Sequence, residues 1–399
     1  MKKAFLIAVG SELLNFKSNT YSPLFASRLR ENGIILSGEI SALDDKKSIK
    51  NALVFASKEA HIIIVCGGLG PTFDDLTRQA VSEFLNTPLI YSTKIEKFLS
   101  SRYPDFHTKQ NLKNQCLIIK NAKLIENRNG TAFGQVIRKG KKIYILLPGP
   151  RNEWEPMWND VERFLKSRRK IFFKRFRFAD LRETEVENLI MPNIKEYSSL
   201  QTTVLAGPNI CELSITSESK RELIEAEKKI HKIACEFIFS CDSQTLEEKV
   251  GELLKKKRLT ISTAESCTGG LLGSTITDVP GSSTYYKGGV NAYSNEIKIK
   301  ILGVRKSTIT KYGAVSEQTV REMALNVKKI FSTDCALSIS GIAGPGGGSQ
   351  QKPVGTVFIC SVYGDKIKLT KKIFSNRSRD YIKKAAVNTA LWHLYKMLK

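Results

Sequence analysis

The chain has 399 residues, of which 41% are hydrophobic and 26% charged, and its formal net charge is +24. This length exceeds what one hydrophobic core usually serves, so we expect two or three domains of an ordinary globular protein. No apolar run approaches the ~20 residues of a membrane-spanning helix, and the eight cysteines contain no CxxC pair. We therefore exclude a membrane protein and a disulfide scaffold, and expect a cytoplasmic protein with reduced thiols.

The first part of the chain alternates strand-like and helix-like patterns. The apolar run at 5–9 stops at Gly10, too early for a signal peptide, and predicts a buried first strand. Further strands are predicted at 34–40, 62–65 and 143–147, and helices at 21–31, at 48–58 and from residue 74 onward. This alternation favours a mostly parallel α/β sheet covered on both faces.

Two further domains are expected after this α/β domain, which we place at 1–170. Residues 171–242 begin with phenylalanines among basic residues and continue with two helical patterns and a strand, which indicates a small α+β domain of KH-like type. Residues 243–399 open with a helix and return to strand–helix alternation, so the last domain is predicted to be α/β.

The positive charge is densest in the run RFLKSRRKIFFKRFR, residues 163–177. Such a run can bind nucleic acid. The alternative is a lysine-rich composition combined with anionic small-molecule substrates. No zinc finger or aromatic RNA-binding signature accompanies the run, so we favour the second interpretation.

A glycine-rich segment, CGGLGPTFDDLTRQAV (66–81), directly follows the apolar strand at 62–65. Gly67, Gly68 and Gly70 let the backbone approach a phosphate closely. Asp74 and Asp75 are predicted to open the next helix, where one aspartate alone would be a cap. Two adjacent carboxylates beside a glycine cradle favour a divalent cation held against a phosphate.

Ser266 lies in TISTAESCTGGLLGSTI (260–276), a strand followed by a glycine turn and a helix. A turn of this kind presents a hydroxyl and backbone N–H donors that suit an anion or a developing oxyanion. A serine nucleophile needs a base. The only histidine of the last domain, His393, lies in an amphipathic pattern typical of packing, so a lysine base is the alternative. Cys267 is a rival nucleophile if the helix start lowers the pKa of its thiol.

The segment SGIAGPGGGSQQKPVGTV (340–357) predicts a glycine loop between strands at 336–339 and 356–360. Its backbone amides and the Ser340 hydroxyl can hold a substrate phosphate or orient a carboxamide. The alternative is a long turn without a ligand.

These segments, with GSSTYYKGGVNAYSNEIK (281–298), resemble the nicotinamide-nucleotide amidase domain of the CinA family, across roughly residues 245–399. The resemblance implies that Ser266 acts together with Lys298 and Tyr293, and that Ser283 contributes a hydroxyl to the same site.

The resemblance also implies an arginine that contacts the substrate phosphate within FSNRSRDYIK (374–383). Arg379 matches that position best, and Arg377 is its rival because one residue is inserted before them. An arginine fork suits a nucleotide monophosphate.

The glycine segment, together with GSELL (10–14), NGTAFG (129–134) and LPGPRNE (147–153), resembles the molybdopterin-binding-type domain at the N-terminus of CinA proteins. The expected fold is three-layered with a parallel-rich sheet. The resemblance implies metal-dependent hydrolysis of ADP-ribose, with a divalent metal held by Asp74 and Asp75.

Asp44 and Asp45 are further candidates for that metal. The chain departs from the family in the loop at 15–20, which lacks the usual glycine, and at Phe133, where proline is usual. A degenerate binding or dimerisation module is therefore the alternative for this domain.

The expected reaction is hydrolysis of the carboxamide of nicotinamide mononucleotide to nicotinic acid mononucleotide and ammonia, in pyridine-nucleotide salvage and without a cofactor. We further expect a homodimer that acts on nucleotides, with no membrane or nucleic-acid partner. The alternative is a catalytically degenerate member of the family that binds nucleotides or associates with nucleic acid.

Overall fold

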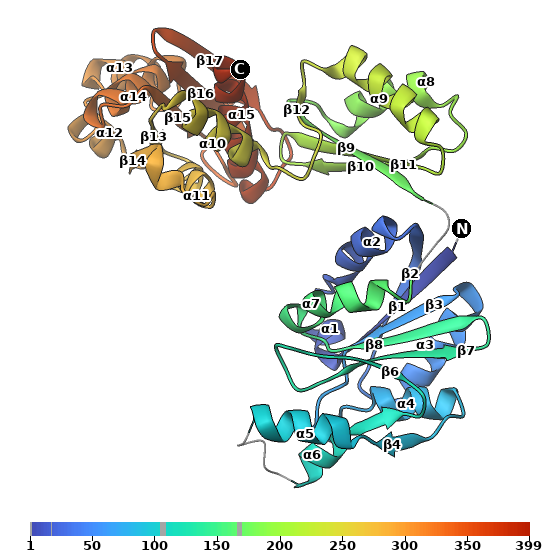
Figure 1. The fold of residues 1–399 in the computed structure, drawn as a ribbon. Coiled ribbons are helices and arrows are strands. Elements are labelled where there is room, and N and C mark those ends of the chain that lie inside the picture. The colour runs from blue at the N-terminus through green and yellow to red at the C-terminus, as the bar shows by residue number, and fades with distance from the viewer. Residues whose placement is uncertain (1, 17, 104–108, 166–169) are drawn as a thin grey trace. The chain divides into compact units, whose positions relative to one another are not determined.

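The computed structural model describes residues 2–16, 18–103, 109–165 and 170–399 (Figure 1). The chain divides into two compact units, Met1–Ile171 and Phe172–Lys399. Each unit has its own sheets and hydrophobic cores and is described by itself.

The first unit is built on a six-stranded sheet with the strand order β2-β1-β3-β8-β7-β6. Strands β2, β1, β3 and β8 run parallel, and β7 and β6 are antiparallel additions at one edge. The strands are β1 (Lys2–Val9), β2 (Ile34–Ala42), β3 (Ile62–Cys66), β4 (Leu89–Tyr91), β5 (Leu117–Ile119), β6 (Lys123–Ile125), β7 (Gly134–Lys139) and β8 (Lys142–Leu147). Strands β4 and β5 form a separate pair.

Helices cover both faces of this sheet, which makes the unit three-layered. They are α1 (Ser11–Asn15), α2 (Tyr21–Glu31), α3 (Lys46–Glu59), α4 (Thr77–Phe84), α5 (Thr93–Arg102), α6 (Lys109–Gln115) and α7 (Arg151–Glu162). Alternate residues of β1 enter opposite cores: Phe5 and Ile7 pack toward α3 and α4, and Ala4 and Leu6 pack toward α2 and α7. Because both faces are covered, the central strand β3 is buried at every position, as its apolar sequence predicts.

The second unit begins with a four-stranded antiparallel sheet of order β10-β11-β9-β12. Its elements are β9 (Phe172–Ala179), α8 (Glu183–Ile194), β10 (Gln201–Gly207), β11 (Ile210–Ser217), α9 (Lys220–Ala234) and β12 (Ile238–Ser240). Helices α8 and α9 pack on one face through a core that includes Phe176, Ile190 and Ile230. This is the α+β arrangement expected for the middle of the chain, and its likeness to the KH fold stays a prediction.

The rest of the second unit is a five-stranded sheet of order β14-β13-β15-β16-β17, in which β14, β13 and β15 are parallel. Its elements are α10 (Leu246–Lys257), β13 (Ile261–Glu265), α11 (Leu271–Thr277), the 3-10 turn η1 (Ser282–Thr284), β14 (Tyr286–Asn291), α12 (Asn295–Lys300), α13 (Lys306–Tyr312), α14 (Glu317–Ile330), β15 (Cys335–Gly341), β16 (Thr356–Tyr363), β17 (Lys366–Ile373) and α15 (Arg379–Leu398).

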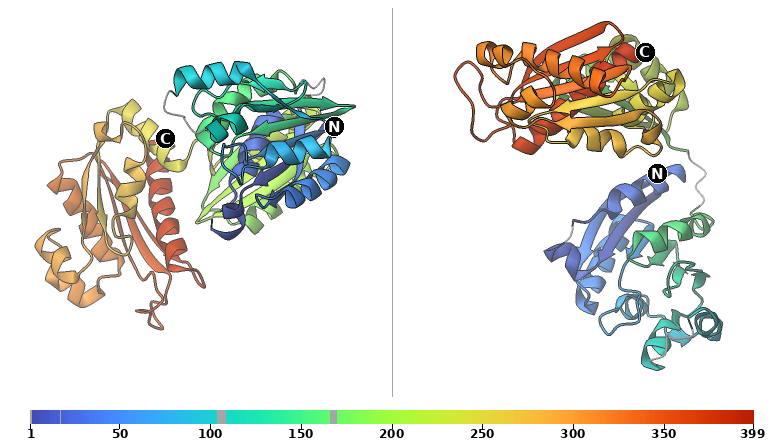
Figure 2. Two further views of the ribbon diagram at one scale, coloured as in Figure 1. Left: turned by 90° about the horizontal axis from the view of Figure 1, so that it is seen from below. Right: turned by 90° about the vertical axis from the view of Figure 1, so that its left-hand side faces the viewer.

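This sheet is also covered on both faces, as Figure 2 shows with α15 on one side of the strands and the orange helices on the other. The core on the first side joins α10 and α15 to the strands, and the core on the second side is supplied by α14. Two hydrogen bonds tie α15 to the β10–β11 hairpin: Asn388 donates to the Pro208 carbonyl at 2.8 Å, and Asn209 donates to Thr389 at 2.9 Å.

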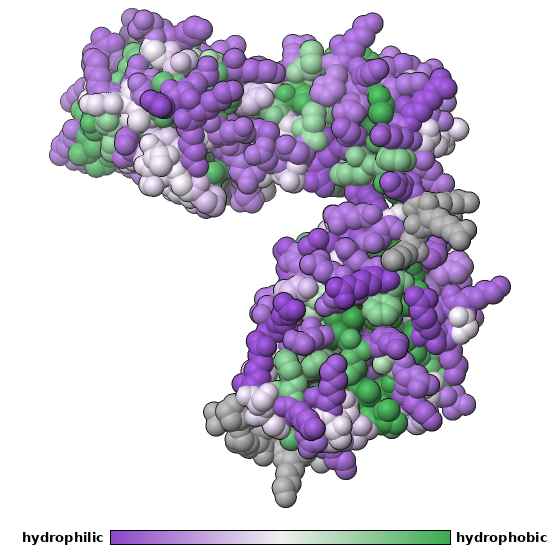
Figure 3. All heavy atoms as spheres, viewed as in Figure 1, coloured by the Kyte–Doolittle hydropathy of each residue, from purple (hydrophilic) through white to green (hydrophobic). Residues whose placement is uncertain are grey.

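The surface of the second unit that faces the viewer in Figure 3 is mostly hydrophilic. None of the helices in the described part of the chain combines the length and apolar character that a bilayer-spanning segment needs.

Candidate active site

The site is assembled at the carboxyl edge of three parallel strands. Ser266 follows β13, Lys298 lies on α12 after β14, and the glycine loop at 342–355 follows β15. Because parallel strands bring their carboxyl ends to one edge of a sheet, these three segments meet there although they are far apart in sequence.

A tight turn places Ser266 between β13 and α11. The Ser266 N–H donates to the Ile339 carbonyl at 3.0 Å, so the backbone of Ser266 is still aligned with β15. Gly269 and Gly270 have φ angles of 61° and 97°, in the left-handed region that favours glycine. The pair of glycines therefore lets the chain reverse within the turn before α11 begins at Leu271.

Ser266 and Lys298 form a direct hydrogen bond, with 2.9 Å between Oγ and Nζ. The Lys298 Nζ atom also lies 2.7 Å from the Ala292 carbonyl oxygen and 3.3 Å from that of Tyr293. Lys298 is 1% exposed and Ser266 is 8% exposed, so the pair is shielded from bulk water. All three described partners of the amine are neutral oxygen atoms.

Burial sets the electrostatics of this pair. Removing the Lys298 ammonium from water disfavours its charged form, and this desolvation lowers the pKa of Lys298. The same effect acts in the opposite direction on the neighbouring thiol, because burial raises the pKa of Cys267 to about 12. Burial therefore favours the neutral form of both groups, the Lys298 amine and the Cys267 thiol.

A cavity of about 280 Å³ opens beside the pair. Its walls are formed by the Ser266 turn, by α12 and by the glycine loop after β15. The residues at its wall include Ser266, Cys267, Tyr293, Lys298, Ser340, Gly344 and Arg379.

Tyr293 and Arg379 meet at the same cavity. The Tyr293 side chain is 64% exposed, and its hydroxyl accepts a hydrogen bond from the Arg379 guanidinium at 3.1 Å. A second guanidinium nitrogen donates to the Gly344 carbonyl at 2.6 Å. In the described structure Tyr293 reaches Lys298 through its backbone carbonyl, whereas its hydroxyl bonds Arg379.

Arg377, the rival of Arg379, points elsewhere. Its guanidinium lies over the Tyr381 ring at 4.7 Å from the centroid, and Arg377 is not among the described residues that line the cavity. Of the two arginines, the structure places only Arg379 beside the Ser266–Lys298 pair.

The two further serines of the predicted site differ in position. Ser340 lines the cavity, but its hydroxyl donates to the Ala314 carbonyl at 2.8 Å and so fixes the backbone. The placement of Ser283 at this site is wrong: it lies exposed on η1, immediately before β14. Because β13 and β14 are parallel, a residue before β14 lies at the opposite edge from Ser266, which follows β13.

His393 is buried, as expected of a packing residue. Its ring lies 3.4 Å from the Thr370 hydroxyl, and desolvation lowers the pKa of His393 to about 4.

The N–H groups at the start of α11 are not free for a substrate, contrary to the expectation from sequence. The Glu265 carboxylate accepts hydrogen bonds from the N–H groups of Gly270 at 3.0 Å, Leu272 at 3.0 Å and Gly273 at 2.8 Å. Glu265 is 2% exposed. Sequence reasoning missed this residue, and the available signal was a carboxylate at the end of a strand, directly before the glycine turn.

In the first unit, the glycine segment after β3 is locked by the residues that follow it. Gly67 has φ 108°, and a Cβ there would lie 2.0 Å from the Val9 carbonyl oxygen, so only glycine fits. Thr77 donates to the Gly67 carbonyl at 2.8 Å. The buried Arg78 guanidinium donates to the carbonyls of Leu69 and Gly70 at 2.7 and 2.8 Å.

Of the two carboxylates beside this segment, Asp75 is bonded to the backbone of the loop. Asp75 accepts from the Gly70 N–H at 2.7 Å and from the Thr72 N–H at 2.9 Å. Asp74 is exposed, and the prediction that the two aspartates open a helix is wrong because α4 begins at Thr77.

The other two candidates for the metal are engaged in the same way. Asp44 accepts from the Ser11 N–H at 2.6 Å, and Asp45 caps α3 by accepting from the Ser48 N–H at 2.8 Å. No group of three or more metal-ligating side chains occurs among the described residues. Because the oxygens of Asp75 are already bonded to the loop and Asp74 lies exposed, this donor set does not fit a divalent cation without rearrangement.

The two places where the chain departs from the family pattern differ in burial: Phe133 is buried, whereas Phe16 in the loop at 15–20 is exposed. Phe133 lies edge-to-face against Phe98 with ring centroids 5.1 Å apart. In the loop at 15–20, Asn15 donates to the Ser11 carbonyl at 2.9 Å, and Lys17 lies outside the described residues.

Comparison with known proteins identifies the family. The description "CinA C-terminal domain" matches residues 243–398, and "Probable molybdopterin binding domain" matches residues 5–167. A CinA-like protein from Pseudothermotoga lettingae is 38% identical, over 100% of this chain and 98% of that protein. A CinA-like protein from Endomicrobium trichonymphae is 39% identical, over 98% of this chain and 97% of that protein. The chain belongs to the CinA family.

Solved structures of CinA proteins cover parts of the chain. The competence/damage inducible protein CihA from Agrobacterium tumefaciens is 35% identical and covers 39% of this chain and 98% of its own, with a TM-score of 0.37. CinA from Thermoplasma acidophilum is 29% identical and covers 42% of this chain and 100% of its own, with a TM-score of 0.39.

The basic run of this CinA protein is partly paired with carboxylates where it is described. Arg175 and Arg177 both pair with Glu212, at 2.8 and 3.0 Å, and Lys174 pairs with Glu227 at 2.7 Å. Residues 166–169 of the run lie outside the described residues. Two carboxylates therefore face the three cations of β9, so the positive charge of this strand is partly balanced by neighbouring elements.

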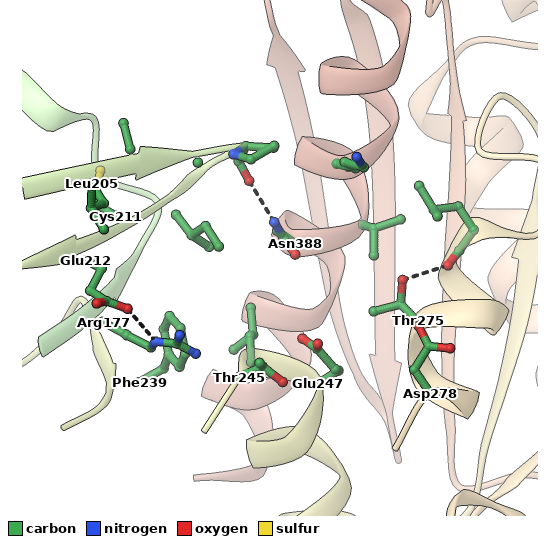
Figure 4. A pocket seen from close by; sticks show the side chains of 18 residues that line it. Arg177, Leu205, Cys211, Glu212, Phe239, Thr245, Glu247, Thr275, Asp278 and Asn388 are labelled. Atoms are coloured by element: carbon green, nitrogen blue, oxygen red, sulfur yellow. Dashed lines mark hydrogen bonds and ion pairs between the residues drawn. The ribbon is translucent and has the colours of Figure 1, made fainter. Parts of the chain in front are cut away.

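A second cavity, of about 540 Å³, lies between the β10–β11 hairpin and helices α11 and α15 (Figure 4). Three of its polar side chains are bonded to the protein: Arg177 to Glu212 at 3.0 Å, Asn388 to the Pro208 carbonyl, and Thr275 to the Leu271 carbonyl at 2.8 Å. The pairing of nucleophile and base, and not cavity size, therefore identifies the smaller cavity as the candidate active site.

Proposed function

We propose that this protein hydrolyses the carboxamide of nicotinamide mononucleotide, giving nicotinic acid mononucleotide and ammonia. The observation that carries the proposal is the 2.9 Å contact between the buried Ser266 hydroxyl and the buried Lys298 amine. A serine hydroxyl becomes an effective nucleophile when a base lies within hydrogen-bond reach.

In the described structure Lys298 Nζ donates to Ser266 Oγ and to the carbonyls of Ala292 and Tyr293. A neutral lysine has two N–H donors and one lone pair. The two carbonyls can accept both donors of the neutral amine, and its lone pair is then available to accept the Ser266 hydroxyl proton. The lowered pKa of Lys298 raises the population of this form.

The reaction proceeds in two halves. The Ser266 oxygen attacks the carboxamide carbon while Lys298 takes the hydroxyl proton. The C–N bond then breaks, and Lys298 returns the proton to the nitrogen, which leaves as ammonia. Water, deprotonated by Lys298, attacks the resulting ester, and cleavage of the ester bond releases the carboxylate and restores Ser266.

Arg379 supplies the charge that a nucleotide substrate requires. Its two described hydrogen-bond acceptors, the Gly344 carbonyl and the Tyr293 hydroxyl, are neutral, and the neighbouring Asp380 pairs with Lys384 at 2.9 Å. The guanidinium charge is therefore available to an anion at the cavity. We propose that it contacts the 5′-phosphate while the carboxamide lies against Ser266.

Assay of the purified full-length protein tests this function. We expect stoichiometric release of ammonia and nicotinic acid mononucleotide from nicotinamide mononucleotide. Binding of the nucleotide without either product would instead indicate a catalytically degenerate member of the family.

The first unit gives less support to hydrolysis of ADP-ribose. Its glycine segment is held by Thr77, Arg78 and Asp75, and the Asp75 oxygens are bonded to the loop backbone. A binding role without hydrolysis is the alternative for this unit, and ADP-ribose binding without turnover is its test.

A further inference from the structure

We infer that Glu265 is a positioning residue for the Ser266–Lys298 pair, an inference that rests on the proposed function. Its side chain fixes the turn that carries the nucleophile, and its backbone fixes the segment that holds the base.

The side chain of Glu265 closes the turn onto itself. Residues 266–270 leave β13 at Glu265 and return to the Glu265 carboxylate, where the N–H groups of Gly270, Leu272 and Gly273 donate at 2.8–3.0 Å. The turn is thus held at both ends by one residue. Ser266 lies at the beginning of this closed loop, where its Oγ faces Lys298.

The backbone of Glu265 is linked to Lys298 through Ala292. Its carbonyl accepts the Ala292 N–H at 2.7 Å, and the Ala292 carbonyl accepts from Lys298 Nζ at 2.7 Å. A shift of Glu265 therefore moves both the nucleophile and one of the carbonyls that orient the amine. Misplacement of reacting groups by ~1 Å is enough to cost about 100-fold in rate.

Only a carboxylate satisfies this arrangement. Three N–H donors converge on two oxygen atoms, and hydrogen bonds from N–H to an ionised acceptor are stronger than neutral ones. Glutamine has the same length but only one acceptor atom, so its NH₂ group would face at least one N–H donor. Glu265→Gln therefore disturbs the turn with almost no change in volume.

Glu322 is the matched control. It is also a carboxylate of the same sheet domain that is held by several hydrogen bonds. It accepts from the Arg305 N–H at 2.9 Å and the Thr308 hydroxyl at 2.7 Å at the start of α13, and it pairs with the Arg305 guanidinium. It lies outside the described residues that line the Ser266 cavity. Glu322→Gln reports the effect of losing a hydrogen-bonded carboxylate without disturbing the Ser266 turn.

The experiment compares full-length wild-type protein, Glu265→Gln and Glu322→Gln in steady-state kinetics with nicotinamide mononucleotide. For Glu265→Gln we expect kcat to fall about 10- to 100-fold with KM within about threefold of wild type. Glu322→Gln should keep wild-type kcat and show a comparable fall in Tm. Equal kcat values in the two variants would overturn the inference.

A second readout does not depend on the substrate. A fluorophosphonate probe reacts with an activated serine: the Oγ–P bond forms, fluoride leaves, and the hydroxyl proton passes to the base. We expect the rate of labelling at Ser266, followed by mass spectrometry, to fall in Glu265→Gln and not in Glu322→Gln. If Glu265→Gln does not fold, Glu265→Asp, which keeps the charge but shortens the reach, should show the same slower labelling.

The positioning role of Glu265 and the proposed substrate can be contradicted independently of each other. Labelling that slows only in the Glu265 variants, in a protein that releases no ammonia from nicotinamide mononucleotide, supports the positioning role and contradicts the proposed substrate. Unchanged labelling in a folded Glu265 variant contradicts the positioning role whatever the substrate.

Discussion

The protonation state of Lys298 depends on its immediate surroundings. Its amine is buried beside the Ser266 hydroxyl and the backbone carbonyls of Ala292 and Tyr293, and this burial lowers its pKa from an ordinary value of about 10.5. A lysine that is protonated cannot accept the serine proton. The local environment therefore decides whether the pair is active at a given pH.

The pH dependence of kcat/KM tests this role. Because only neutral Lys298 acts as a base, we expect activity to be low at acidic pH and to rise as Lys298 loses its proton, with the midpoint of the rise below pH 10.5. Lys298→Met should abolish turnover. Lys300→Met is the control, since Lys300 is exposed and pairs with Glu296 at 2.6 Å. A profile that falls with rising pH over this range would contradict a lysine base.

Recognition of the phosphate is a second property of a single residue. We expect Arg379→Ala to weaken the use of nicotinamide mononucleotide by about 1.5–3 kcal/mol, or roughly 10- to 100-fold, for a lost charged hydrogen bond. The unphosphorylated riboside should be affected little, and Arg377→Ala should resemble wild type. Comparison of kcat/KM for the two substrates checks this, and equal losses on both would remove Arg379 from the phosphate.

At the scale of elements, the same device recurs in both units: a glycine turn after a buried strand is closed by a nearby carboxylate. Glu265 closes the turn before α11, and Asp75 closes the turn before α4 through the N–H groups of Gly70 and Thr72. In each case the carboxylate satisfies backbone donors that a turn would otherwise leave unpaired.

The hydrogen bonds that Asp75 accepts predict a difference between two adjacent aspartates. Asp75→Asn should lower the unfolding free energy of the first unit by about 1 kcal/mol, whereas Asp74→Asn, at an exposed position, should change it little. Thermal unfolding of the full-length protein measures both. Amide hydrolysis should be unchanged in either variant because the Ser266 site lies in the other unit. Similar unfolding curves for the two variants would contradict the role of Asp75 in closing the loop.

At the scale of the molecule, all candidate catalytic residues fall in one compact unit. Ser266, Lys298, Tyr293 and Arg379 lie within Phe172–Lys399, whereas the glycine segment of the molybdopterin-binding-like domain lies within Met1–Ile171. Division of the chain between Ile171 and Phe172 should therefore separate two activities if both exist.

This division gives a further prediction. A protein consisting of residues 172–399 should hydrolyse nicotinamide mononucleotide with kcat near that of the full chain, and a chelator should not reduce its activity, because the proposed steps use side chains and water. Ammonia release from the fragment, with and without chelator, is the measurement. Activity lost on chelation and restored by added metal would contradict the Ser266–Lys298 mechanism.

Sequence reasoning reached the turn at Ser266 because its signals are local: a short extended segment, two glycines and a helix. Lys298 could not be selected in this way from 63 lysines and arginines, and only the family resemblance distinguished it. Its contact with Ser266 spans 32 residues and arises because β13 and β14 are parallel. The same topology explains why the prediction for Ser283 was wrong, since Ser283 precedes β14 and therefore lies at the opposite edge of the sheet from Ser266.

The aspartates of the first unit show a second reason why a site cannot be predicted fully from the sequence. A cap and a metal ligand use the same residue type at the same position in sequence, and only the direction of the oxygens distinguishes them. The Asp75 oxygens point to Gly70 and Thr72, which a pattern of residues does not reveal. Glu265 was missed for the same reason: it is the last residue of β13, and the sequence does not reveal where its carboxylate points.

The most direct test of the Ser266–Lys298 pair is ammonia release from nicotinamide mononucleotide by full-length Ser266→Ala and Cys267→Ala proteins. Cys267 is the matched control because it lines the same cavity but burial raises the pKa of its thiol to about 12. We expect Ser266→Ala to lose turnover completely while Cys267→Ala keeps most of it, both with wild-type unfolding temperatures. Loss of turnover in a folded Cys267→Ala protein, with activity retained in Ser266→Ala, would contradict a serine nucleophile.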